Sequence, residues 1–215
     1  GMTLPKLELL AQSFKKLGVG APHHIVLYSS NGMQWATRIW AMLAAVGYQS
    51  VSVLDGGLDE WRRLGFATES GINKFDPAEF DAQIDTGFFI EKDNVLSVLG
   101  RKDCVLLNSL TTDIFKGESK RYGRPGRIPG SINIPFHALL NASRGTLKSP
   151  GEIVSILNDA GIKSNNRIIN YCGGGIAATL TAFVLYQLGF DHLEIYDNSM
   201  SEWAMDTTLP IETDI

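Results

Sequence analysis

Residues 167–178 read RIINYCGGGIAA, and this stretch decides the fold of the chain. The apolar run that ends at Tyr171 is typical of a buried strand, and the apolar residues after the glycines are typical of a helix. Cys172 is therefore predicted to lie at a strand-to-helix turn. Consecutive glycines allow N–H groups to point at the sulfur, and the first turn of a helix adds unpaired N–H groups. Such surroundings favour the thiolate, which is the nucleophilic form of cysteine.

The loop that begins at Cys172 is the predicted active site. Its other members are Gly173, Gly174, Gly175, Ile176 and Ala177. The alternative interpretation is a buried structural thiol beside a glycine turn, because free cysteine is among the most buried residue types. The run of glycines at the predicted junction favours the nucleophile.

The pattern around Cys172 occurs twice in the chain. Each copy has a Gly, a Tyr that ends an apolar run, a second Gly, an Asp that opens a turn, and a Trp. These lie at Gly18, Tyr28, Gly47, Asp55 and Trp61, and again at Gly161, Tyr171, Gly189, Asp197 and Trp203. The matched spacing indicates two copies of one supersecondary unit. Ser29 takes the place of Cys172 in the first copy, so only the second copy has the thiol.

Predicted strands, among them residues 25–28 and 51–54, alternate with predicted helices in both copies, which is typical of an α/β fold with a parallel sheet flanked by helices. Residues 113–127 are predicted to form a polar loop. We expect residues 1–70 to form a partial, non-catalytic domain and residues 88–215 a complete catalytic domain. Residues 71–87 are the predicted linker, because periodicity fades there and Gly, Asn, Asp and Pro accumulate. The earlier part of the second copy has no counterpart before Leu4, which indicates a natural truncation or a misassigned start.

The first copy carries large apolar side chains that a short unit cannot bury alone. They are Phe14, Trp35, Trp40 and Met42. We expect this region to pack on a second copy of the chain, on another protein, or across the complete domain. A symmetric homodimer through the first copy is the simplest of these outcomes.

Several motifs together carry a family resemblance. They are residues 126–135 (GRIPGSINIP), the loop at Cys172, residues 196–199 (YDNS) with Glu202 and Trp203, and residues 53–57 (VLDGG) with Trp61. With these motifs the chain resembles a tandem-domain rhodanese-type sulfurtransferase of the thiosulfate and 3-mercaptopyruvate group. The resemblance implies a thiolate that takes sulfane sulfur as a persulfide and passes it to a second nucleophile.

The resemblance also implies a site for a small anionic sulfur donor. The loop has no charged residue, which is similar to the mercaptopyruvate branch, but Gly174 and Ala177 stand where that branch usually has hydroxyl residues. The nearest matches to the family's anion-binding residues are Lys116, Arg121 and Arg124. The alternative is that these three are a solvated basic loop.

Two other function classes remain to be weighed. A cysteine phosphatase needs an arginine that closes the loop on the phosphoryl oxygens, and no arginine follows Cys172, which argues against it. A persulfide carrier or a non-catalytic rhodanese-like binding module stays open, because the first copy is incomplete. For an enzyme, the expected acceptor is a thiol, either a small one or that of a thioredoxin-like protein, or a cyanide-like nucleophile.

Composition limits the kinds of partner and cofactor that we expect for the chain. The chain has 215 residues, 44% of them hydrophobic, and a net charge of -4 with no long basic run, which argues against nucleic acid as a partner. No apolar stretch of membrane-spanning length and no leader are evident, so we expect a cytoplasmic protein without membrane contact. Cys104 and Cys172 lack the spacing of a zinc site, and we expect neither a metal nor a cofactor.

Overall fold

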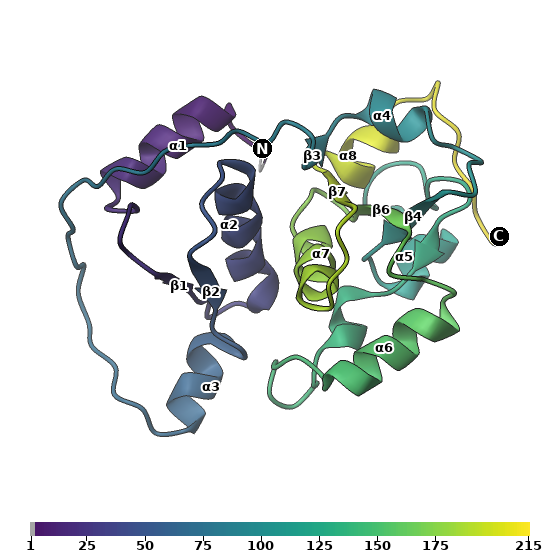
Figure 1. Ribbon diagram of the computed structural model, residues 1–215. Coiled ribbons are helices and arrows are strands. Elements are labelled where there is room, and N and C mark those ends of the chain that lie inside the picture. The colour runs from purple at the N-terminus through teal and green to yellow at the C-terminus, as the bar shows by residue number, and fades with distance from the viewer. Residues whose placement is uncertain (1–2) are drawn as a thin grey trace.

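The computed structural model describes residues 3–215, and its larger part is built on a sheet of five parallel strands (Figure 1). The strand order is β3 (Phe89–Ile90), β7 (Leu193–Tyr196), β6 (Arg167–Tyr171), β4 (Cys104–Asn108) and β5 (Ile132–Asn133). The longest strands, β4 and β6, lie at the centre. The parallel α/β architecture that the alternating pattern predicted is confirmed.

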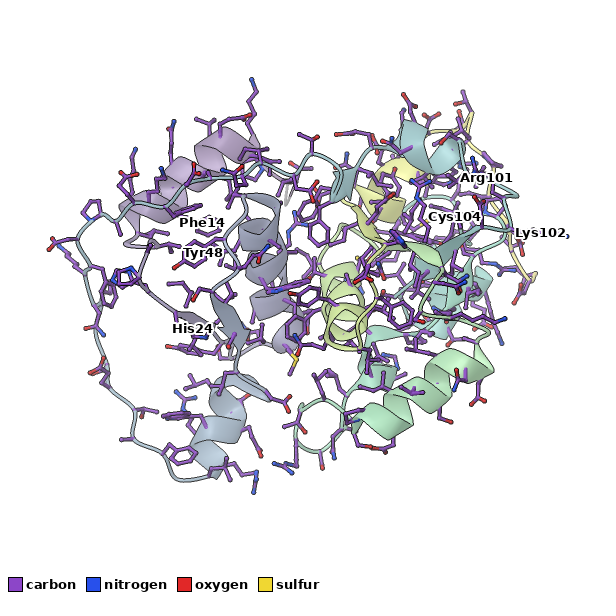
Figure 2. The ribbon with its side chains drawn as sticks, viewed as in Figure 1. Phe14, His24, Tyr48, Arg101, Lys102 and Cys104 are labelled. Carbon is purple, nitrogen blue, oxygen red and sulfur yellow. The ribbon has the colours of Figure 1, made fainter. Side chains whose placement is uncertain are left out.

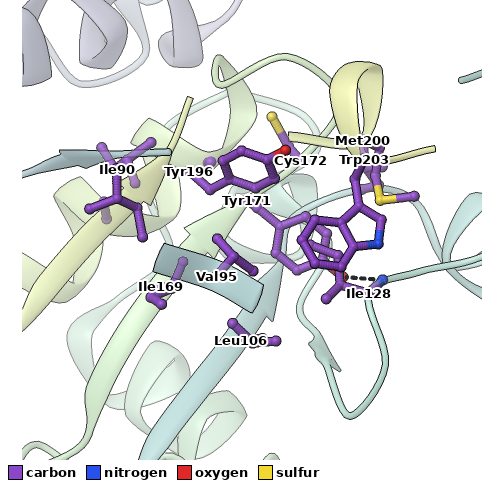
Figure 3. Packing of buried hydrophobic residues seen from close by; sticks show 14 of the residues in the cluster. Ile90, Val95, Leu106, Ile128, Ile169, Tyr171, Cys172, Tyr196, Met200 and Trp203 are labelled. Atoms are coloured by element: carbon purple, nitrogen blue, oxygen red, sulfur yellow. Dashed lines mark hydrogen bonds between the residues drawn. The ribbon is translucent and has the colours of Figure 1, made fainter. Parts of the chain in front are cut away.

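Helices cover both faces of this sheet, which explains why β6 is buried on both faces from Ile168 to Tyr171. On one face, Ile169 and Tyr171 pack with the helical segments α4 (Lys92–Leu96), α5 (Thr112–Lys116) and α8 (Ser199–Trp203). On the other face, Ile168 packs with α6 (Pro150–Asp159), the turn η1 (Phe136–Leu139) and α7 (Ala177–Gln187). Figure 3 shows the first of these clusters, in which Trp203 and Tyr196 are fully buried.

The first part of the chain forms a smaller α/β unit. Two parallel strands, β1 (Ile25–Leu27) and β2 (Val51–Val53), are joined through α2 (Met33–Ala45). Helices α1 (Leu7–Lys16) and α3 (Gly57–Arg63) complete the unit. Phe14 and Tyr48 point toward one another in its core (Figure 2). The predicted strands at 25–28 and 51–54 are thereby confirmed to within a residue.

The segment after α3 returns along the outside of this unit toward α1 and then to β3 (Figure 1). It is held by backbone hydrogen bonds, among them Ala78 N–H to Lys15 O and Gln83 N–H to Val46 O. Gly47 has a φ of 82°, and a Cβ there would lie 2.8 Å from the Gln83 backbone oxygen. The close approach of this segment therefore requires glycine at position 47.

Helix α2 packs side by side with α7, and this contact joins the two parts of the chain (Figure 1). The Trp40 ring lies 5.0 Å from Phe183 and 6.1 Å from Phe88, both edge-on. Thr37 and Thr179 share a buried hydrogen bond of 3.0 Å. Of the predicted outcomes for the large apolar residues, packing across the larger part of the same chain is the one observed for Trp40. Trp35 stays 41% exposed.

The predicted polar loop at 113–127 is wrong at its beginning, since α5 occupies Thr112–Lys116. The helix is short and buries one apolar residue, Ile114, so it has no periodicity that a sequence pattern can reveal. Among residues 3–215 no helix has both the length and the apolar character needed to cross a membrane. The predicted cytoplasmic location stays a prediction.

Candidate active site around Cys172

Cys172 follows the last residue of β6 and is 2% exposed. Figure 3 shows its sulfur at the end of the core cluster, on the side away from Val95 and Leu106. The carboxyl end of a central parallel strand is where open α/β sheets place their ligand sites. The predicted strand-to-helix turn is confirmed, because α7 begins at Ala177 and no side chain caps its N-terminus.

Residues at the start of α8 form hydrogen bonds with the loop at Cys172. The Cys172 N–H donates to Ser199 Oγ at 3.0 Å, and Ser199 Oγ donates in turn to the Tyr196 carbonyl at 2.7 Å. The Ser201 hydroxyl and the Ser201 N–H both donate to Gly173 O, at 2.5 and 2.8 Å. Ser199 has a φ of 51°, and no other non-glycine residue in the described part of the chain has a positive φ. This strained backbone is consistent with a constrained functional loop.

The three glycines differ in what they permit. A Cβ on Gly173 would lie 2.0 Å from the Tyr122 hydroxyl oxygen, and one on Gly175, where φ is 72°, would lie 2.5 Å from the Asp197 carbonyl. Gly174 faces open space, with only Ser201 Oγ nearby at 3.6 Å. Glycine is therefore required at 175, whereas a side chain at 173 would displace the Tyr122 ring. At 174 the absence of a side chain leaves room in the site.

A pocket of about 390 Å³ opens beside the thiol. Both parts of the chain line it. Its lining includes the apolar residues Trp35, Leu110, Ile114 and Phe136, the polar residues Gln34, Thr111, Arg121, Tyr122 and Ser201, and the loop residues Cys172, Gly173, Gly174, Ile176 and Ala177. This volume lies at the lower end of the range for small-molecule pockets.

The predicted basic residues do not all reach this pocket. Arg121 lines it, with its guanidinium 5.7 Å from the centre of the Tyr122 ring. Lys116 is exposed at the end of α5 and is not among the lining residues. Of the three predicted anion ligands, the structure brings Arg121 to Cys172.

Arg124 is not among the lining residues, and its guanidinium is hydrogen-bonded to another part of the chain. Its guanidinium donates to backbone carbonyl oxygens at and beyond the C-terminal end of α8, those of Trp203, Ala204, Asp206 and Leu209. A cation at a helix C-terminus pairs with carbonyls that have no partner in the helix. The geometry therefore supports a structural role for Arg124.

Sequence reasoning missed eight lining residues: Gln34, Trp35, Leu110, Thr111, Ile114, Tyr122, Phe136 and Ser201. Gln34 and Trp35 enter the site because α2 packs on α7, a contact that no local pattern predicts. Tyr122 lies next to Arg121 in the predicted polar loop, and it is partly buried against Gly173. Burial raises the pKa of Tyr122, and the nearby Cys172 adds to the increase, while the Arg121 charge opposes it.

The sequence pattern of the rhodanese-like domain matches residues 2–64 and 112–206, more than half of the chain. This chain belongs to the rhodanese family. Human 3-mercaptopyruvate sulfurtransferase is 36% identical over 207 residues, which cover 94% of this chain and 69% of the human protein. Thiosulfate sulfurtransferase of Cricetulus griseus is 32% identical, over 94% of this chain and 70% of that protein. The resemblance to rhodanese-type sulfurtransferases is confirmed.

A solved structure shares the fold of this chain. An anaerobic ergothioneine biosynthesis enzyme from Chlorobium limicola, in complex with trimethyl histidine, superposes with a TM-score of 0.88 at 24% identity. The match covers 99% of this chain and 56% of that one, so the chain spans little more than half of the solved protein. At this identity the likeness shows the fold alone.

The second cysteine of the chain lies outside the pocket. Cys104 opens β4 close to Arg101 (Figure 2) and is absent from the lining of the Cys172 pocket. Burial raises the pKa of the Cys104 thiol, which disfavours the thiolate. Within residues 3–215 no cluster of His, Cys, Asp and Glu is arranged to hold a metal ion.

Proposed function

We propose that the chain is a sulfurtransferase that carries sulfane sulfur as a persulfide on Cys172. The observation that carries this proposal is the position of Cys172: it is the one cysteine on the pocket, at the end of a central strand and beside an uncapped helix N-terminus. An anionic sulfur is stabilised by N–H donors and by the helix dipole. The sulfurtransferase relatives support the same chemistry.

Sulfur transfer then proceeds in two displacements. The Cys172 thiolate attacks the donor's transferable sulfur, which is the sulfane sulfur of thiosulfate or the thiol sulfur of 3-mercaptopyruvate. An S–S bond forms, and the donor's bond to that sulfur breaks with its electrons leaving on the donor. A thiol or a cyanide-like acceptor removes the outer sulfur and regenerates the thiolate. We propose that Arg121, which lines the pocket, attracts the anionic donor.

We propose 3-mercaptopyruvate as the preferred donor and thiosulfate as the alternative. The loop from Cys172 to Ala177 contains no cation that would hold a second negative charge, and this supports the mono-anionic keto acid. Intact-mass measurement after incubation with each donor tests the proposal. We expect a gain of one sulfur atom, on Cys172. A protein that gains no sulfur from either donor is not a sulfurtransferase of this kind, and stable persulfide without turnover to acceptors indicates a carrier.

We also propose that two copies associate through the smaller unit, which we take to be a non-catalytic rhodanese-like unit. Support comes from an apolar groove of about 370 Å³ beside β1 and α3, lined by Val26, Tyr28, Leu54, Leu58 and Trp61 among others. Val26 and Tyr28 are more than half exposed. Exposed apolar surface beside a strand edge favours association. Sedimentation at micromolar concentration should show a dimer that Val26→Glu disrupts, and a monomer would refute the association.

A further inference from the structure

The pocket at Cys172 contains three side-chain hydroxyls, and two of them are engaged. The Ser201 hydroxyl donates to Gly173 O at 2.5 Å. The Thr111 hydroxyl is hydrogen-bonded to the Asp113 carboxylate. Neither can donate its proton to a ligand without breaking a contact that orders the loop or the start of α5.

The third hydroxyl belongs to Tyr122, and it has no hydrogen-bond partner among the described residues. Its oxygen lies against Gly173, the residue next to the nucleophile, so close that any side chain at position 173 would collide with it. A partly buried hydroxyl without a partner is unfavourable unless a ligand or water completes it. Because Tyr122 and Cys172 line the same pocket, Tyr122 borders the space where a donor bound to Cys172 must lie.

The loop itself supplies no proton donor. Residues 172–177 are Cys, Gly, Gly, Gly, Ile and Ala, without a hydroxyl or an ionisable group besides the thiol. Desulfuration of 3-mercaptopyruvate needs a proton, because breaking its C–S bond leaves the electron pair on carbon as an enolate. Release of sulfite from thiosulfate needs none, because sulfite is stable as a dianion.

We propose that Tyr122 is a catalytic residue that protonates the pyruvate enolate when 3-mercaptopyruvate is the donor; this rests on the proposed function of Cys172. The thiolate attacks the donor's thiol sulfur, the S–S bond forms, and the C–S bond breaks. Tyr122 Oη gives its proton to the enolate carbon, which becomes the methyl group of pyruvate. The tyrosinate takes the proton of the new S–SH group, which is more acidic than a phenol. The tyrosine's proton thus ends on pyruvate, the donor's thiol proton restores the tyrosine hydroxyl, and the persulfide is left as an anion.

Two features keep Tyr122 suited to this task. Burial raises its pKa, so the hydroxyl holds its proton at neutral pH and is present as an acid. Its ring packs on Gly173 through carbon atoms as well as through the oxygen. A Cβ added to Gly173 would lie 2.2 Å from Tyr122 Cζ. Tyr122→Phe therefore removes the hydroxyl and leaves the ring that supports the loop.

The test compares the two donors on one variant. Persulfide formation on Cys172 is followed by rapid quench and intact mass for wild type, Tyr122→Phe and the control Tyr186→Phe, whose ring lies outside the pocket. We expect Tyr122→Phe to slow the reaction of 3-mercaptopyruvate about 100-fold and to leave that of thiosulfate within twofold. The control should match wild type with both donors.

The outcomes separate this inference from the function on which it rests. Equal rates for Tyr122→Phe and wild type with 3-mercaptopyruvate overturn the role of Tyr122. An equal loss with both donors also overturns it, because that loss indicates a structural role. If the wild-type protein accepts sulfur from thiosulfate alone, the proposed role of Tyr122 is overturned, because 3-mercaptopyruvate is then not a donor. The proposed sulfur transfer by Cys172 is kept in that case. A wild type that accepts sulfur from neither donor refutes the proposed function itself.

Discussion

The Arg38 guanidinium of α2 forms an ion pair with the Asp197 carboxylate, which follows β7. The same Nη1 donates to the Gly175 carbonyl oxygen at 3.2 Å. The two side chains are 6% and 12% exposed. The smaller unit thus holds the end of the active-site loop directly, and Asp197 also accepts a hydrogen bond of 2.7 Å from the Leu4 N–H.

Arg38→Ala should destabilise the protein, because it leaves the Asp197 carboxylate buried without its cation. Breaking one side of a buried pair costs about 3–5 kcal/mol. Urea denaturation measures the free energy of unfolding, and Arg38→Lys should lose less because it keeps the charge. Arg62→Ala, an exposed position on α3, is the control and should stay within about 0.5 kcal/mol of wild type. A loss below 1 kcal/mol in Arg38→Ala would show that the pair does not couple the two parts.

Cys172→Ser should abolish sulfur uptake, and Cys104→Ser should leave it unchanged. The reason is that only Cys172 lies on the pocket, while burial raises the pKa of the Cys104 thiol. Intact mass after incubation with each donor is the measurement, and both variants should unfold at the same urea concentration as wild type within error. Persulfide on the Cys172→Ser protein would remove the central proposal.

Arg121→Ala should weaken donor binding without destabilising the fold, since Arg121 is exposed at the pocket. Loss of a charge-assisted contact costs about 2 kcal/mol, which corresponds to about a 30-fold increase in KM. Steady-state kinetics at several salt concentrations check this expectation. Unchanged KM would assign Arg121 to the solvated surface.

Arg124→Ala is the matched comparison, three residues along the same segment. Because its guanidinium donates to four carbonyl oxygens around the end of α8, its removal should lower the free energy of unfolding by about 2–4 kcal/mol. KM should change little in the protein that remains folded. An increase in KM with unaltered stability would instead restore the predicted anion-binding role of Arg124.

Acid should weaken a second contact between the two parts. Hydrogen bonds from Arg63 and then Arg144 lower the pKa of Glu60 from 4.5 to about 2. A depressed carboxyl pKa stabilises the fold above its unfolded value and loses that contribution as pH falls from about 4.5 toward 2. The difference in free energy of unfolding between wild type and Glu60→Gln should therefore shrink across this interval. Parallel pH profiles in urea denaturation would contradict the assignment; Glu8→Gln, an exposed carboxyl on α1, is the control.

Much of the fold and the nucleophile follow from local sequence. The apolar run before Cys172 and the three glycines after it predict a strand, a tight turn and a helix, and β6 and α7 lie there. Strand and helix periods are properties of neighbouring residues, so a pattern of a few residues is enough to reveal them. The short helix α5 was not predicted, because five residues with one buried apolar side chain show no helical periodicity.

The rest of the site depends on tertiary packing. Gln34 and Trp35 reach the pocket because α2 lies on α7. Tyr122 reaches it because its ring packs on Gly173. Arg124 lies outside the pocket lining because its guanidinium donates to backbone carbonyl groups at the end of α8. The sequence by itself determined the strand-to-helix turn, the thiol on it and the parallel direction of the strands. Only the tertiary structure decided which polar side chains share the thiol's pocket, because side chains that are distant in sequence meet only when whole elements bury their apolar faces against one another.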